Sequence, residues 1–125
     1  KLLFQIADRE GFNKIAFGHH LDDIAETILL NMCYRAEIGA MCPRQEIFSG
    51  KITMIRPLAY VHEYEIRALV EEGKVVNFKG HACPNDQRSK RVMFKEIIQR
   101  IEQENPGVKL NIVNSLKNIK KDYLL

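Results

Sequence analysis

The amino-acid sequence predicts an α/β fold built on a parallel sheet. Apolar residues with helical spacing at positions 2–10 lead into a short apolar strand at 14–17, and a polar loop and a second helical segment follow. This order of helix, strand, loop and helix is typical of domains in which helices cover a parallel sheet. The 125 residues are 46% hydrophobic and 28% charged, which suits one compact domain and is too apolar for a disordered chain.

The first helix is indicated by apolar residues that recur from the start of the chain. They are Leu2, Leu3, Ile6 and Ala7. Because the chain has no initial Met and opens within this pattern, we expect further protein upstream. Gly11 is the expected residue after the helix end. The second helix follows the polar loop at 18–23 and is expected to run from Ile24 to about Tyr34.

The middle of the chain predicts a hairpin and a third helix. Residues 37–46 show no period and are interpreted as a loop, and residues 47–55 resemble two short strands about a Ser-Gly turn. Pro57 ends the second strand because proline cannot donate a hydrogen bond to a neighbouring strand. A helix is expected at about 62–72, followed by Gly73. Its apolar face is expected to carry Ile66, Leu69 and Val70.

The C-terminal part predicts a short strand at 75–78, a turn-rich loop at 79–88 and two helices. Ser89 is the expected N-cap of the first helix, which residues 105–107 terminate. Its apolar stripe consists of Val92, Met93, Ile97, Ile98 and Ile101. The last helix is expected at about 108–120. Its packing face would carry Leu110, Val113, Leu116 and Ile119, and its outward face Lys109, Lys117, Lys120 and Lys121.

Charge is divided unevenly along the chain. The net charge of +3 is too small to indicate a nucleic-acid partner by itself. Residues 1–73 have 8 basic and 11 acidic side chains, whereas residues 74–125 have 11 basic and 5 acidic ones. The second part is therefore a candidate surface for a polyanion. A basic face that serves only solubility is the other interpretation.

Location and redox state follow from what the sequence lacks. No apolar run approaches the roughly 20 residues of a membrane span, and the N-terminus has no secretory signal pattern. We therefore expect a cytoplasmic protein with no membrane partner. Three cysteines without a CxxC pair argue against a disulfide framework. Cys33, beside the apolar Met32, is interpreted as a core thiol, and Cys83 in the loop as a better candidate for a thiolate ligand.

The loop after the first strand has an unusual density of chemically active side chains. His19, His20, Asp22 and Asp23 lie within five residues at the carboxyl end of a strand, where parallel sheets bind ligands. Two carboxylates beside a phosphate could hold Mg²⁺. A capping box between Asp23 and Glu26 explains those two residues without any ligand. A zinc or two-metal phosphohydrolase with His62 and His81 as distant ligands is a further alternative.

Several segments together resemble one known family. Residues 18–27 read GHHLDDIAET, residues 29–32 LLNM and residues 55–60 IRPLAY, and Cys83 is followed by Arg91. This pattern resembles the tRNA 2-thiocytidine synthetase family of PP-loop ATPases. The first motif is also similar to that of the tRNA(Ile)-lysidine synthetases. Arg56 in the third segment could bind phosphate or form a structural ion pair.

The resemblance implies an enzyme that uses ATP to thiolate a cytidine of tRNA at position 2. It implies a Rossmann-like fold of the adenine nucleotide alpha hydrolase kind, ending in basic helices. It implies ATP, Mg²⁺ and a [4Fe-4S] cluster as cofactors, and tRNA, a sulfur donor protein and a second copy of the chain as partners. By position, Asp22 and Asp23 would be catalytic and Cys83 a cluster ligand. The residues lining the ATP and Mg²⁺ site would be His19, His20, Glu26, Thr27 and Arg56.

Two expected motifs are missing from the chain. The phosphate-binding SGGxDS loop and the CxxC that supplies other cluster ligands are absent, and Gly80 stands where relatives often have another Cys. The chain therefore looks like the C-terminal part of such an enzyme. Residues 1–78 would belong to the ATP-binding domain, and residues 79–125 would add the cysteine loop and basic helices to it. Alternatives are a lysidine-synthetase-like ligase and a non-catalytic RNA-binding or assembly module.

Overall fold

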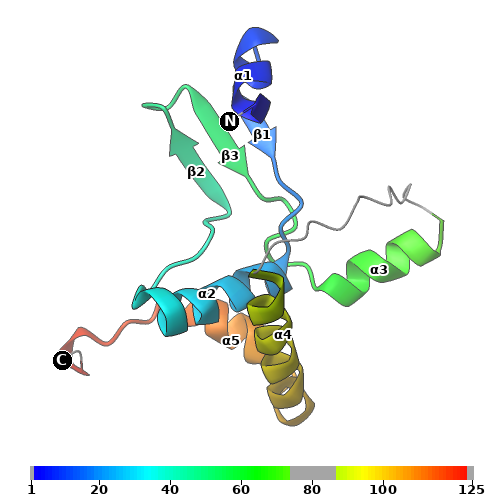
Figure 1. Cartoon of the computed structure of the whole chain (residues 1–125), viewed down its shortest axis with the longest axis vertical. Helices are drawn as coiled ribbons and strands as arrows, with labels where there is room; N and C mark the ends of the chain where they lie inside the picture. The colour runs from blue at the N-terminus through cyan, green and yellow to red at the C-terminus, as the bar shows by residue number, and fades with distance from the viewer. Residues whose placement is uncertain (1, 74–86, 124–125) are drawn as a thin grey trace.

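A computed structural model describes residues 2–73 and 87–123, and the side chains of 87–89 are not described. The elements are α1 (Leu2–Arg9), β1 (Lys14–Ala16), α2 (Leu21–Arg35), β2 (Arg44–Ile47), β3 (Ile52–Ile55), α3 (Glu63–Glu71), α4 (Gln87–Glu104) and α5 (Val108–Ser115), with a short 3-10 helix η1 (Lys121–Tyr123) (Figure 1). The predicted strand at 75–78 and the loop with His81, Cys83 and Pro84 lie outside the described residues.

The sheet has the order β1-β3-β2 and is mixed. β1 pairs with β3 in parallel, with Ile15 opposite Met54, as the predicted α/β fold requires. β2 is antiparallel to β3, so the predicted hairpin is confirmed. Its first strand begins at Arg44, however, and the prediction of a loop up to residue 46 was wrong there. The reason is that β2 reads Arg-Gln-Glu-Ile and is exposed over its first three residues, so it has no apolar alternation.

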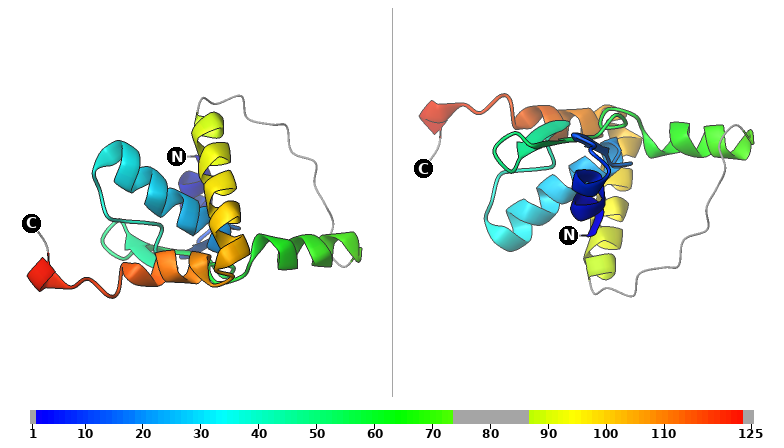
Figure 2. Two further views of the ribbon diagram at one scale, coloured as in Figure 1. Left: turned by 90° about the horizontal axis from the view of Figure 1, so that it is seen from below. Right: turned by 90° about the horizontal axis from the view of Figure 1, so that it is seen from above.

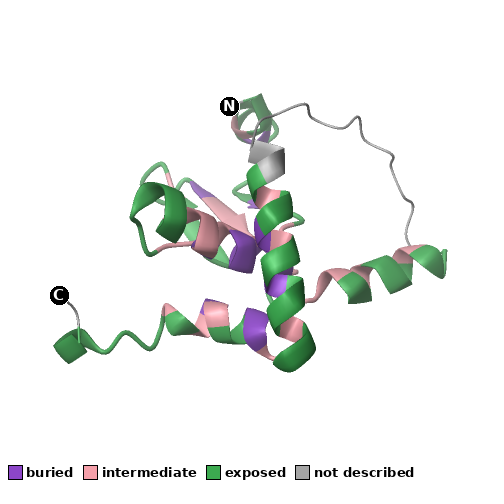
Figure 3. Ribbon diagram, turned by 60° about the horizontal axis from the view of Figure 1, so that its bottom comes forward, coloured by how far each residue is buried: buried purple, intermediate pink, exposed green. Residues whose placement is uncertain are grey.

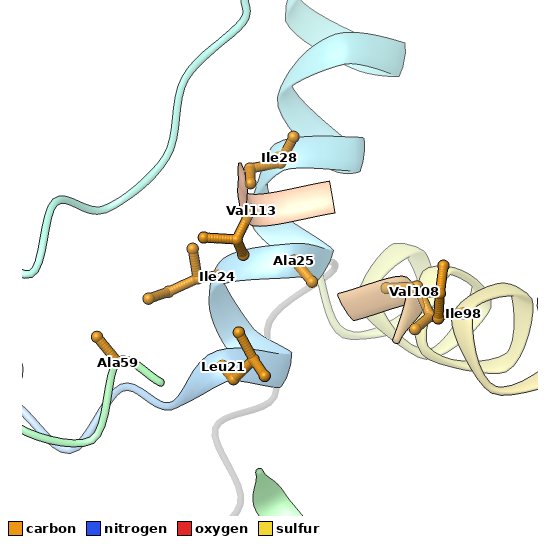
Figure 4. Packing of buried hydrophobic residues seen from close by; sticks show 8 residues of the cluster. All are labelled: Leu21, Ile24, Ala25, Ile28, Ala59, Ile98, Val108 and Val113. Atoms are coloured by element: carbon orange, nitrogen blue, oxygen red, sulfur yellow. The ribbon is translucent and has the colours of Figure 1, made fainter. Parts of the chain in front are cut away.

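Two separate clusters form the core. The smaller one joins Ala7 of α1 to Ile15 and Ile52 of the sheet. The larger one gathers apolar residues from α2, α4, α5 and the turn after β3 (Figure 4): Leu21, Ile24, Ala25, Ile28, Ala59, Ile98, Val108 and Val113. The buried residues of the helices face one another where α2, α4 and α5 meet (Figure 3). This cluster therefore fixes the first turns of α2, which follow the polar loop.

Helix α3 extends away from the other helices (Figure 2), and none of its residues is buried. Ile66 and Val70 are only half-buried and Leu69 is exposed. The predicted range of the helix is close to the observed one, but its expected apolar face does not pack into the core. Its place is fixed instead at its N-terminus, where polar contacts join it to α2.

The C-terminal helices differ from the prediction in their boundaries and in the face they bury. Helix α4 begins at Gln87, so Ser89 lies inside the helix and is not its N-cap. Ile98 of the predicted stripe is buried, whereas Val92, Met93, Ile97 and Ile101 are exposed, and Phe94, outside the stripe, is buried beside Ile98. Helix α5 ends at Ser115, and Ile119 lies beyond it and is exposed. Residues 105–107 separate the two helices as predicted.

Candidate functional site

The polar loop after β1 leads directly into the N-terminus of α2. The helix begins at Leu21, three residues earlier than predicted, because Leu21 is completely buried and its N–H donates to the Val61 carbonyl at 3.0 Å. His20 is therefore the N-cap, and its N–H donates to Asp23 Oδ2 at 3.0 Å. This contact corrects the predicted capping box between Asp23 and Glu26. Glu26 lies one turn into the helix, without a capping role.

Asp22 is a buried carboxylate at the junction of three helices. Its Oδ1 lies 2.6 Å from Lys109 Nζ of α5, and its Oδ2 accepts a hydrogen bond from the Glu63 N–H of α3 at 2.9 Å. Burial by itself raises the pKa of Asp22. The hydrogen bonds from Lys109 and Glu63 outweigh it and place the pKa below the ordinary value of 3.8. Asp22 is thus a charged residue that connects α2, α3 and α5.

Lys109 is buried, although the sequence pattern placed it on an outward face. Its Nζ lies 2.6 Å from Asp22 and 2.9 Å from Glu102 Oε2 of α4. Burial lowers the pKa of Lys109, but hydrogen bonds to the two carboxylates outweigh this and raise the pKa above its ordinary value. Position 109 precedes Val113 by four residues and therefore lies on the packing stripe of α5. A lysine on such a stripe is the sequence signal that could have indicated its burial.

A second group of charges lies where α3 approaches α4. Glu63 accepts from Lys95 Nζ at 2.6 Å and from Arg67 Nη2 at 2.6 Å. Burial raises the pKa of Glu63, but these two hydrogen bonds lower it to about 2. Glu63 therefore stays ionised and holds Lys95 toward the first turns of α2. Neither residue was singled out from the sequence, because each belongs to an ordinary surface-type pattern of charges.

Glu26 and Arg91 lie beside a cavity of about 150 Å³, whose lining also includes His20, Asp23, Glu63 and Lys95. Arg91 Nη1 is 3.7 Å from Glu26 Oε2, and Arg91 Nη2 donates to Thr27 Oγ1 at 3.5 Å. Burial, followed by the nearby charge of Asp23, raises the pKa of Glu26 to about 7, against the opposing charges of Lys95 and Arg91. The cavity thus contains a carboxyl group that titrates near neutrality.

His19 and Arg56 form a separate group at the carboxyl ends of β1 and β3. Arg56 Nε donates to His19 Nδ1 at 3.3 Å, and Arg56 Nη1 donates to the Cys42 carbonyl oxygen. The His19 ring stacks on the Phe17 ring with 5.6 Å between their centroids, and the Arg56 guanidinium carbon lies 5.9 Å from the Phe17 centroid. Arg56 is buried without a carboxylate partner among the described residues. The structural ion pair considered for Arg56 is therefore not found in that part of the chain.

The predicted site residues thus form two groups. His20, Asp22, Asp23, Glu26 and Thr27 lie at the N-cap and on the first two turns of α2, and His19 with Arg56 lies at the carboxyl ends of β1 and β3. The Nδ1 atom of His20 is buried and has no hydrogen-bond partner among the described residues. His62 Nδ1 is likewise buried without a hydrogen bond, and Asp22 Oδ2 lies 3.9 Å from His20 Nδ1.

The described residues contain no group of three His, Cys, Asp or Glu side chains that could hold a metal ion. The zinc alternative therefore has no support in residues 2–73 and 90–123. Mg²⁺ needs only one or two carboxylates when substrate phosphates complete its coordination, and the partly exposed Asp23 fits that requirement. Cys33 and Cys42 are both exposed, which corrects the expectation that Cys33 is a core thiol. Cys83 lies outside the described residues.

No helix in the described part of the chain combines the length and the apolarity that crossing a bilayer requires.

Curated relatives match the chain along almost its full length. A tRNA-cytidine(32) 2-sulfurtransferase of Geobacter sulfurreducens is 40% identical over 126 residues, covering 99% of this chain and 49% of the relative. The protein of the same name from Nitrosospira multiformis is 36% identical over 124 residues, covering 99% of this chain and 42% of the relative. The chain therefore spans about half the length of the curated relatives it matches.

A solved structure has a fold similar to that of this chain. The U34-tRNA thiolase NcsA from Methanococcus maripaludis with its [4Fe-4S] cluster superposes with a TM-score of 0.74 at 24% identity, covering 94% of this chain and 39% of that protein. At this identity the likeness concerns the fold. The sequence pattern of the PP-loop domain family matches residues 1–101. With most of its length matched in this way, the chain belongs to the PP-loop domain family.

Proposed function

We propose that the protein containing this chain is an ATP-dependent tRNA sulfurtransferase that replaces the 2-oxygen of a cytidine with sulfur. The observation that carries the proposal is the 40% identity, over 99% of the chain, to a tRNA-cytidine(32) 2-sulfurtransferase. The arrangement at the start of α2 supports it, because a strand end followed by a helix N-terminus is where α/β domains bind phosphates.

His19 and Arg56 would bind the nucleotide at the strand ends. Because His19 accepts from Arg56 at Nδ1, its Nε2 carries the proton and can donate to a phosphate oxygen. The Arg56 guanidinium is held by two acceptors and retains further donors for phosphate. His20, the N-cap of α2, would complete this side of the site, and Glu26 and Thr27 would line it from the second turn of α2.

Asp22 and Asp23 have different environments and would have different roles. Both oxygens of Asp22 are already bound within the protein, so it would act by fixing the start of α3 against α2. Asp23 is bound only through Oδ2 among the described residues and is partly exposed. Asp23 would therefore hold Mg²⁺, which would neutralise phosphate charge when bound.

The chemistry requires activation of a poor leaving group. In such a reaction the cytidine 2-oxygen attacks the α-phosphate of ATP and pyrophosphate leaves, after which sulfur attacks the base carbon and AMP leaves with the oxygen. A [4Fe-4S] cluster, with Cys83 as one ligand, would supply the sulfur. Residues 1–78 would belong to the ATP-binding domain and residues 79–125 to its cysteine loop and basic helices. The partners would be tRNA, a sulfur donor protein and a second copy in the cytoplasm.

The test measures two steps in the full-length protein. Release of pyrophosphate from ATP in the presence of unmodified tRNA reports activation, and incorporation of labelled sulfide, with release of AMP, reports transfer. We expect Asp23→Asn to reduce both, and Cys83→Ser to abolish incorporation while activation continues. Cys33→Ser is the matched control and is expected to retain both steps. Incorporation of lysine instead of sulfur, or full incorporation by Cys83→Ser, would contradict the proposal.

A further inference from the structure

An apolar cavity of about 350 Å³ lies on the side of α2 that faces the end of α5. It is formed by α2, the loop before β2, the turn after β3, and the end of α5 with the residues beyond it. Its lining includes Ile24, Met41, Cys42, Tyr60, Leu116 and Lys117. The volume lies at the lower end of the range for small-molecule sites. The cavity is therefore large enough for one flat ring system.

Tyr60 is displayed from a rigid turn at this cavity. The preceding residue, Ala59, is 1% exposed and belongs to the helical core, whereas Tyr60 is 51% exposed. The turn is closed by hydrogen bonds from the Ala59 N–H to the Arg56 carbonyl at 3.1 Å and from the Val61 N–H to the Leu58 carbonyl at 2.9 Å. The backbone at Tyr60 is thus held by the turn, and its half-exposed ring lines the cavity.

One lysine contacts the Tyr60 ring, and further lysines follow it in the chain. Lys117 Nζ lies 3.5 Å from the Tyr60 hydroxyl and 5.6 Å from the ring centroid. Lys120 Nζ lies 5.9 Å from the ring centroid of Tyr123, which is 83% exposed. Within the described residues, Lys117, Lys120 and Lys121 have no carboxylate at ion-pair distance. Lys95 and Lys109, by contrast, are each paired at 2.6 Å, so only part of the basic C-terminal region is free for an external anion.

We propose that Tyr60 and Lys117 form a binding surface for single-stranded RNA, with one unstacked base in the cavity and the adjoining phosphates on Lys117, Lys120 and Lys121. Charge complementarity favours a polyanion, and the exposed ring with an apolar hollow favours a base free to leave its stack. A duplex offers no such base. The specific identity of the RNA as a tRNA loop rests on the proposed function.

The surface adjoins the candidate nucleotide site. Cys42 lines the cavity, and its carbonyl accepts the hydrogen bond from Arg56, which also contacts His19. Ile24 lines the cavity from the first turn of α2, one residue after Asp23. A base bound in the cavity would thus place a neighbouring nucleotide of the same strand toward the start of α2.

The experiment measures binding of the full-length protein to a labelled RNA hairpin with an unpaired loop, by fluorescence anisotropy over a salt series. We expect Tyr60→Ala to weaken binding roughly ten-fold. We expect Lys117→Gln to lower the slope of log affinity against log salt by about 0.7, because one phosphate contact with a single strand is lost. A blunt duplex of the same stem is expected to bind weakly and to show no effect of Tyr60→Ala.

A matched pair of residues outside the cavity provides the control. Lys90 Nζ lies 4.4 Å from the ring of Tyr34, which is 48% exposed, so this pair repeats the chemistry without the cavity. Tyr34→Ala and Lys90→Gln are expected to leave RNA affinity unchanged. Circular dichroism and thermal unfolding establish that each variant is folded. If Tyr60→Ala does not fold, Tyr60→Leu and Lys117→Glu replace it, and both are expected to weaken loop binding.

Three results would contradict the proposed RNA-binding surface. The first is equal loop affinity for the cavity variants and the wild type, and the second is an equal loss of affinity in the Tyr34 and Lys90 controls. The third is an effect of Tyr60→Ala that is confined to self-association or to binding of anionic lipid vesicles. Sulfur incorporation is measured in parallel with the same preparations. Wild-type protein that binds the loop through Tyr60 but transfers no sulfur would contradict only the proposed function. Sulfur transfer with unaltered loop binding by Tyr60→Ala would contradict only the surface.

Discussion

Lys109 Nζ of α5 lies 2.6 Å from Asp22 Oδ1 of α2, and both residues are buried. Through its other oxygen, Asp22 accepts the Glu63 N–H at the start of α3. One ion pair therefore holds three helices together next to the candidate nucleotide site. Figure 1 shows that α3 otherwise extends away from the helical group, so this junction fixes where α3 begins.

Replacing Lys109 with Met should be costly, because it leaves the Asp22 and Glu102 carboxylates without their cation. We expect the free energy of unfolding to fall by about 3–5 kcal/mol, as found when one partner of a buried pair is removed. Urea unfolding followed by circular dichroism measures it. Lys120→Met is the control, and its effect should stay within about 0.5 kcal/mol. Equal effects for the two variants would show that the pair does not hold the junction.

Glu26 should make stability depend on pH. Its pKa is about 7 in the folded protein against an ordinary value of 4.5. Between these values the folded state binds more protons than the unfolded state, so this contribution lowers stability as pH rises from 4.5 to 7. We expect Glu26→Gln to remove that slope. Between pH 5 and pH 7 its free energy of unfolding should therefore fall less than that of the wild type. Urea unfolding at several pH values checks this, with the exposed Glu96→Gln as control. An unchanged slope in Glu26→Gln would be evidence against the raised pKa of Glu26.

The face by which α4 packs is testable with two neighbouring positions. Phe94 is 4% exposed and Ile97 is 42% exposed. Phe94→Ala should reduce the free energy of unfolding by about 3–5 kcal/mol. Ile97→Ala should cost less than about 1 kcal/mol, because it creates no cavity in the described core. The reverse order would mean that α4 is rotated relative to the face described for it.

Arg56 should matter for nucleotide binding through its geometry as well as its charge. Arg56→Lys keeps the positive charge but loses the planar group that reaches both His19 and Cys42. We expect the affinity of the full-length protein for a non-hydrolysable ATP analogue to fall at least about ten-fold, which corresponds to one hydrogen bond to a charged group. Isothermal titration calorimetry measures it, with the exposed Arg9→Lys as control. Wild-type affinity in Arg56→Lys would remove Arg56 from the site.

The sequence predicted the features that depend on local pattern. The helix, strand and polar loop at the start of the chain, the hairpin and the break at residues 105–107 were all found. Spacing could not identify the packing of Lys109, because a lysine on an apolar stripe is buried only if carboxylates from other helices meet it. Asp22 and Glu102 supply those carboxylates from α2 and α4.

The predicted packing face of α4 was right at Ile98 and wrong at its other four residues, for a related reason. Its apolar residues occupy more than one face of the helix, and Phe94 was not part of the predicted stripe. The helix packs through Phe94 and Ile98, which lie four residues apart. The edge strand β2 was missed in part because its exposed polar residues have no periodicity. Contacts with other elements decide which residues of α4 are buried and where β2 begins.

The product formed on tRNA tests the proposed sulfurtransferase activity most directly. Full-length protein is incubated anaerobically with ATP, Mg²⁺, a sulfide source and unmodified tRNA, and the nucleosides are analysed by mass spectrometry. We expect 2-thiocytidine with wild-type protein, none without ATP, and a large loss with Asp23→Ala but not with Asp122→Ala. Finding no 2-thiocytidine with a wild-type protein that is folded and binds ATP would contradict it.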